Sequence, residues 1–157
     1  MKLEISQTSA LQAAMLRDTL AYGVRNIEQV EIVFSAAAAL DRVLPDWLET
    51  IRETRALRMM FLFQDGEPVK MCETSAAPQI RKLDGFPSSF DEWLACDREE
   101  ALDLEGGLPW RVTFWPSERR FVWTFHHALL DGRSITRILR AFQARLTGNH
   151  IPEALEL

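Results

Sequence analysis

Two strongly apolar segments in the C-terminal third constrain the fold more than any other feature of the sequence. Residues 110–115 and 121–127 are rich in aromatic and β-branched side chains, and the polar stretch Pro-Ser-Glu-Arg stands between them. Such side chains favour strands, and the polar stretch favours a hairpin turn. The two segments therefore predict a pair of strands at the centre of a sheet.

Segments with helical spacing of apolar residues surround these strands. The first follows a capping residue at Thr8 or Ser9 and ends at Gly23, because glycine readily leaves the helical conformation. Another follows Ser88 or Ser89 and runs to about residue 103. Two more helices are predicted at about 41–54 and 134–146.

Four further strands are predicted, at about 29–34, 57–64, 68–73 and 80–83. The second and third of these are joined at Asp65-Gly66, where glycine accepts the positive φ that a tight hairpin needs. The sequence therefore predicts an α/β domain in which a mixed β-sheet is flanked by helices.

The composition restricts the kinds of function. The 157 residues are 47% hydrophobic, which fits one globular domain over 1–157. The formal net charge of −5 argues against a nucleic-acid partner, which needs basic residues to neutralise phosphates. No apolar run approaches the roughly 20 residues that cross a membrane, so we expect a soluble, cytoplasmic protein. Cys72 and Cys96 form no CxxC pattern, so reduced thiols are expected rather than a disulfide or a zinc site.

Two adjacent histidines mark the candidate site. His126 and His127 end the second apolar strand, and Asp131 and Gly132 follow after three residues. A strand end that opens into a loop is where α/β proteins commonly place catalytic groups. Because successive strand residues point to opposite faces, the two histidines cannot easily share a metal ion or a substrate atom. We predict that one faces the reaction and the other packs in the domain, and we expect no metal site.

Two charged residues are expected to support this loop. Asp131 follows the apolar stretch Ala-Leu-Leu, and an ionised carboxylate there needs a cationic partner. Arg58 is the one charged residue in the apolar segment 57–61 and needs an anion for the same reason. We infer that Arg58 and Asp131 pair inside the domain and so aim His127. Gly132 is expected to give the turn unusual backbone freedom and to let the chain pass close to a substrate.

Three motifs carry a resemblance to a known family. Residues 126–132, HHALLDG, resemble the HHxxxDG motif of condensation domains from nonribosomal peptide synthetases, which belong with the chloramphenicol acetyltransferase-like acyltransferases. Residues 9–16, SALQAAML, resemble the SxAQxxM-type motif, and residues 57–61, LRMMF, resemble the LRTxF motif. The motifs stand in the family's order, and the resemblance covers essentially the whole chain.

The resemblance implies a reaction. It assigns His127 the catalytic role, as a general base or as a group that positions the nucleophile, and makes His126, Asp131, Gly132 and Arg58 supporting residues. The acyl or peptidyl group would pass from the phosphopantetheine thioester of a carrier protein to an amine or hydroxyl. A general base contributes roughly 10²–10⁴-fold to the rate, and a backbone N–H near Gly132 could help to bind the oxyanion. No bound cofactor is expected beyond the carrier's phosphopantetheine arm.

The chain also departs from the family pattern. A full condensation domain resembles two such lobes in a V, with the active site between them. We therefore expect this chain to be the N-terminal lobe of a chloramphenicol acetyltransferase-like fold, to lack the C-terminal lobe, and to act as an enzyme only with that lobe or a second subunit. The helix at 134–146 and the strand edge beside it should then expose apolar surface. Met59 replaces the usual Thr of the second motif, and Phe125 the common Met before the histidines.

Other interpretations remain open beside this one. The chain could be a non-catalytic docking or assembly module of a synthase, or a small oligomeric acyltransferase with its histidine at a subunit interface. A serine hydrolase is disfavoured because Gly132-x-Ser134 lacks the final glycine of a nucleophile elbow, and Ser134 is better explained as the cap of the last helix. Trp110, Trp115 and Trp123 are better explained as core residues than as the lining of an acyl channel.

Overall fold

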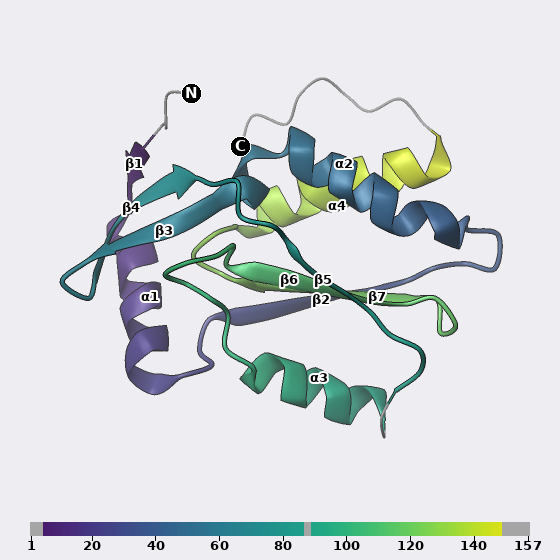
Figure 1. The fold of residues 1–157 in the computed structure, drawn as a ribbon, viewed down its shortest axis with the longest axis horizontal. Helices are drawn as coiled ribbons and strands as arrows, with labels where there is room; N and C mark the ends of the chain where they lie inside the picture. The colour runs from purple at the N-terminus through teal and green to yellow at the C-terminus, as the bar shows by residue number, and fades with distance from the viewer. Residues whose placement is uncertain (1–4, 87–88, 149–157) are drawn as a thin grey trace.

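The computed structural model describes residues 5–86 and 89–148. In this part of the chain, helices lie on both faces of a sheet, and a smaller sheet stands at one end (Figure 1). The helices are α1 (Ala10–Tyr22), α2 (Val43–Glu53), α3 (Phe90–Glu99) and α4 (Gly132–Thr147). The strands are β1 (Ile5–Gln7), β2 (Ile27–Val33), β3 (Met59–Gln64), β4 (Glu67–Glu73), β5 (Gln79–Lys82), β6 (Trp110–Trp115) and β7 (Arg120–His126).

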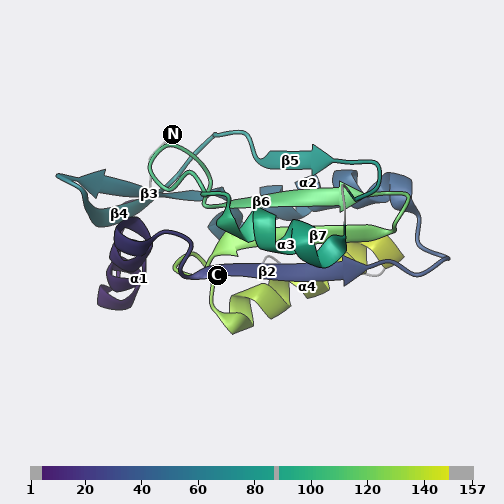
Figure 2. The ribbon, with the colours of Figure 1, turned by 90° about the horizontal axis from the view of Figure 1, so that it is seen from below.

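The larger sheet is mixed, as predicted. Its order is β2-β7-β6-β5, and β5 runs parallel to β6 while the other neighbours are antiparallel. Figure 2 shows these strands side by side, with α3 in front of them and α2 and α4 behind. The smaller sheet, β1-β4-β3, is antiparallel and lies beside α1. The predicted hairpin between β3 and β4 is confirmed, with φ of 52° at Asp65 and 79° at Gly66.

The β6–β7 hairpin forms the centre of the core, as the two apolar segments predict. Trp110 and Trp123 are fully buried on the face that α2 and α4 cover, where both rings pack edge-on against Trp47 of α2. On the other face, the rings of Trp115 and Trp93 of α3 lie 4.3 Å apart. The prediction that Trp110, Trp115 and Trp123 are core residues is therefore confirmed.

A buried ionic cluster fixes α3 to the sheet. Asp97 of α3 accepts hydrogen bonds from Nε of Arg111 at 2.9 Å and from the hydroxyl of Thr124 at 2.6 Å. The side chains of Asp97 and Arg111 are each 1% exposed. Arg111 also donates to the backbone carbonyls of Asp97 and Glu100. Asp97 and Arg111 can remain charged at this depth because hydrogen bonds satisfy the carboxylate and the guanidinium group.

Two boundaries in the structure differ from the predicted ones, one of a helix and one of a strand. The third predicted helix ends at Glu99 rather than at about 103, because the guanidinium of Arg111 binds the carbonyl groups at its end. Its cap is Ser89, whose hydroxyl accepts from the backbone N–H of Glu92; Ser88, the other predicted cap, lies outside the described residues. The strand predicted from residue 57 begins at Met59, because 55–58 form a 3₁₀ turn.

The expected apolar surface on the last helix is found only in part, since Leu139 and Leu146 line an open hollow beside β2. Ile138 and Phe142 of α4 are buried in the core. Among the described residues, none of the exposed large hydrophobic side chains lies on α4. The strand edge does keep an open apolar face, since Val33 is 62% exposed and a hollow of about 710 Å³ separates β2 from α4. In addition, no helix in the described part of the chain is long and apolar enough to cross a membrane.

Candidate functional site

His126, the last residue of β7, is a buried structural residue. Its side chain is fully buried, and its Nδ1 accepts a hydrogen bond from the backbone N–H of Ala128 at 3.1 Å. The ring proton is therefore on Nε2, which lies 2.8 Å from the hydroxyl of Thr19 on α1. Burial, with a smaller contribution from the neighbouring His127, lowers the pKa of His126 to about 4. His126 is thus neutral at pH 7 and holds the strand end against α1.

His127, the next residue, lines an open pocket. The pocket has a volume of about 380 Å³ and lies between the N-terminal half of α1 and the loop 127–131. Nδ1 of His127 is buried and has no hydrogen-bond partner within residues 5–86 and 89–148. The two histidines therefore occupy different environments, as alternation along a strand requires, and His127 is the one that faces the pocket.

Two hydrogen bonds from outside the loop hold its backbone on either side of the His127 ring. The backbone N–H of His127 donates to the carbonyl of Asn26 at 2.8 Å. The side-chain amide of Gln12 donates to the carbonyl of Ala128 at 2.9 Å. Gln12 also completes the capping box of α1 with Ser9, so the same side chain begins the helix and fixes the histidine loop.

Sequence reasoning missed Asn26. Its φ is +60°, a region that asparagine enters more readily than other non-glycine residues. Its amide group donates to the carbonyl of Met15 at 3.1 Å and to the carboxylate of Asp18 at 3.3 Å, so its carbonyl is held for His127. The sequence did contain a signal for this turn, because an asparagine stands between Gly23, where the helix ends, and the next strand.

The expected ion pair between Arg58 and Asp131 is not formed. Nε of Arg58 lies 2.7 Å from the carboxylate of Glu73 on β4. Asp131 is exposed and is the N-cap of α4, where its carboxylate accepts from the backbone N–H of Ser134 at 2.8 Å. That hydrogen bond lowers the pKa of Asp131. The prediction of a pair was wrong because the helix N-terminus supplies Asp131 with its donors, and the β3–β4 sheet supplies Arg58 with its anion.

The beginning of α4 corrects two further expectations. Ser134 is the third residue of the helix and not its cap, a position that Asp131 takes. Gly132 does not have positive φ, so the turn needs no unusual backbone conformation there. A Cβ at Gly132 would meet no atom within 4 Å in the described part of the chain. Open space therefore lies in front of the first turn of α4.

The site provides one imidazole and the N-terminus of a helix. This combination can accept a proton from a nucleophile and stabilise negative charge on a substrate oxygen. Among the described residues, no group of three or more His, Cys, Asp or Glu side chains could hold a metal ion.

Comparisons with known proteins connect the chain to peptide synthetases, although no family model matches it. Nonribosomal peptide synthetase 30 of Fusarium vanettenii is 34% identical over 105 residues, which cover 62% of this chain and 2% of that synthetase. Nonribosomal peptide synthetase sirP of Leptosphaeria maculans is 26% identical over 99% of this chain and 8% of its own length. Nonribosomal peptide synthetase dtxS1 of Metarhizium robertsii is 23% identical over 95% of this chain and 2% of its own length. The chain thus spans less than a tenth of each of these relatives.

Solved structures have the same fold. The starter condensation domain of the rhizomide synthetase RzmA superposes with a TM-score of 0.75 at 16% identity, over 96% of this chain and 40% of that one. The tallysomycin biosynthesis protein TlmII gives a TM-score of 0.75 at 24% identity, over 92% and 39%. The chain therefore has the fold of half a condensation domain, and both the predicted fold class and the predicted resemblance are confirmed.

Proposed function

We propose that this chain is the HHxxxDG-bearing, N-terminal lobe of a condensation-type acyltransferase, with His127 as its catalytic residue. It would act on an acyl or peptidyl thioester held by the phosphopantetheine arm of a carrier protein. The nucleophile would be an amine or a hydroxyl group. We further propose that the active site is completed by a second lobe or subunit, and that the reaction takes place in the cytoplasm.

The observation that carries this proposal is the contrast between the two histidines. His126 is buried and fully hydrogen-bonded, while His127 faces an open pocket and is held by its backbone. A histidine that served only the fold would be expected to have its ring nitrogens satisfied within the lobe, as His126 does. A pocket that lies on the surface of the lobe also suits a site completed by another lobe.

The chemistry needs one proton acceptor and one oxyanion site. The nucleophile's nitrogen or oxygen attacks the thioester carbonyl, and His127 takes the proton that it loses. The carbon–sulfur bond then breaks, and His127 returns the proton to the departing thiolate. The N–H of Gly132, at the first turn of α4, is suited to stabilise the intermediate's oxyanion. The open space in front of Gly132 supports this role.

The test is acyl transfer from a panel of loaded carrier proteins to amine acceptors. The chain alone, the chain with a second condensation lobe, and each with His127→Ala would be compared. We expect activity only with the second lobe, and a loss of about 10²–10⁴-fold in the variant. Unchanged turnover in the variant would contradict the catalytic role and favour a docking or assembly module.

Two further outcomes discriminate the remaining interpretations. Full activity of the chain alone, in an oligomeric form, would favour a small acyltransferase with its histidine at a subunit interface. Ser134 lines the same pocket as His127, so Ser134→Ala tests a serine nucleophile. A loss as large as that of His127→Ala, together with an acyl-enzyme intermediate, would contradict direct transfer.

A further inference from the structure

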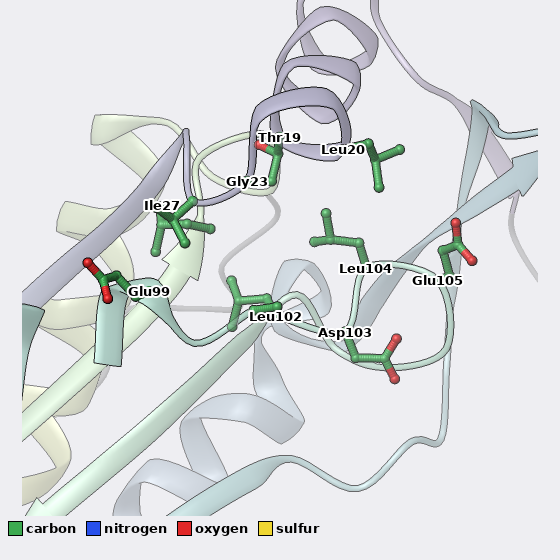
Figure 3. Close-up of a pocket in the computed structure, with 11 residues that line it drawn as sticks. Thr19, Leu20, Gly23, Ile27, Glu99, Leu102, Asp103, Leu104 and Glu105 are labelled. Carbon is green, nitrogen blue, oxygen red and sulfur yellow. The ribbon is translucent and has the colours of Figure 1, made fainter. Parts of the chain in front are cut away.

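A second pocket lies at the opposite end of α1 from His127. It has a volume of about 450 Å³ and is formed by the C-terminal end of α1, the start of β2 and the loop after α3. This volume is in the range of small-molecule sites. Figure 3 shows that Leu20, Ile27, Leu102 and Leu104 converge on the hollow. We call this hollow the α1–α3 pocket.

The wall of the α1–α3 pocket is apolar and partly open to solvent. Leu20 is 46% exposed and Val24 is 41% exposed, although both side chains are large and apolar. Leu102 and Leu104 form a buried floor. Exposed apolar side chains that gather around a hollow commonly mark a place where another group is bound.

The rim of this pocket is acidic. Glu99, Asp103 and Glu105 line it (Figure 3), and none of the described residues in the lining is Lys or Arg. Asp103 is partly used by the turn that follows, where its carboxylate accepts from the N–H of Gly106. Glu99 and Glu105 are exposed and form no ion pair with another described residue. The rim therefore carries negative charge on both sides of the hollow, which favours a cation at its edge.

From this charge complementarity we propose that the α1–α3 pocket binds a small molecule with a linear alkyl chain that ends in an ammonium group. The chain lies against Leu20, Ile27 and Leu104, and the ammonium group lies at the rim beside Glu105. This site is separate from the His127 pocket, which uses the other end of α1. The inference does not depend on the proposed acyl transfer.

The direct test is a titration of the whole chain followed by ¹³C-methyl NMR, with octylammonium, hexylammonium and octanoate as probes. Octylammonium is expected to shift the methyl signals of Ile27, Leu102 and Leu104 in a saturable way, while those of the core residue Ile138 stay unchanged. Hexylammonium should bind about tenfold more weakly, because two methylene groups fewer are buried. Octanoate should bind about tenfold more weakly than octylammonium at low salt, because its charge is repelled by the rim. Equal binding of octanoate, or shifts that do not saturate, would overturn the proposal.

Variants separate the apolar and the ionic contributions. Leu20→Lys places an ammonium group on a flexible stem beside the rim, so octylammonium should bind at least about tenfold more weakly. Leu48→Lys is the matched control, since Leu48 is 43% exposed on α2 and does not line the pocket. The double variant Glu99→Gln, Glu105→Gln should reduce the preference for octylammonium over octanoate by about threefold or more. An unchanged preference in the double variant, or equal weakening by both lysine variants, would contradict the assigned site.

Discussion

Acidification should destabilise this lobe through one residue, His126. The ordinary pKa of histidine is 6.5, and burial lowers that of His126 to about 4. Between these values the unfolded chain binds a proton that the folded chain does not bind at this position, so stability falls as the pH falls. The contribution is fully present above pH 6.5 and is lost on the way to pH 4. The shift corresponds to about 3 kcal/mol in total, of which about 2 kcal/mol is lost between pH 7 and pH 5.

Urea unfolding followed by tryptophan fluorescence measures this loss, because Trp47, Trp110 and Trp123 are buried in one core. The free energy of unfolding would be determined at intervals from pH 5 to pH 8. The control is His126→Gln, which keeps an N–H donor near Thr19 but does not titrate. It is expected to be less stable at pH 8 and to lose about 2 kcal/mol less than the natural chain on acidification to pH 5.

The comparison isolates His126 from the other titrating groups, since His127 and the carboxylates are the same in both proteins. Equal pH dependence in the two proteins would refute the reasoning. So would an NMR titration in which His126 takes up its proton near pH 6.5 with the fold intact.

Three other changes test the remaining parts of the lobe. Asp97→Ala leaves Arg111 charged and buried without its partner, so we expect unfolding in urea to show a loss of about 3–5 kcal/mol; a loss below about 1 kcal/mol would mean that the pair contributes little. Gln12→Ala removes the donor to Ala128 and half of a capping box, and should lower stability by about 1–2 kcal/mol while acyl transfer by the complete assembly falls further than unfolding explains. Gly132→Ala should fold normally and gain up to about 1 kcal/mol, because its Cβ meets open space; a loss of transfer activity in that stable variant would locate a substrate close to Gly132.

Most of the fold could be predicted because its signals are local. Strand β6 has the predicted limits, Trp110–Trp115. A short apolar segment rich in aromatic residues and bounded by turn residues strongly favours a strand. The cap at Ser9 and the end of α1 at Gly23 follow from the chemistry of single residues. The end of α3 could not be predicted in this way, because it depends on the guanidinium of Arg111, which lies 11 positions after Glu100, whose carbonyl it binds.

The site was predictable in its residue types and not in its pairings. Alternation along a strand separated His126 from His127 but could not say which of them is buried. The partner of Arg58 was chosen by charge alone, a condition that all 23 Asp and Glu residues satisfy. Glu73 is the partner because the β3–β4 register places it opposite Met59, the residue that follows Arg58 in the sequence. Residue contacts of this kind follow from the register of a sheet, which the pattern of apolar residues leaves open.

The hydrogen bond from Gln12 to Ala128 joins positions 116 residues apart. Its formation requires the chain to close a loop that includes most of the lobe. Contacts of such long range form slowly compared with helices and hairpins. The histidine loop should therefore become ordered late in folding. During synthesis, α1 is made long before Ala128, the residue that Gln12 contacts. A chain that stops before β7 therefore lacks the loop to which Gln12 of α1 donates its hydrogen bond.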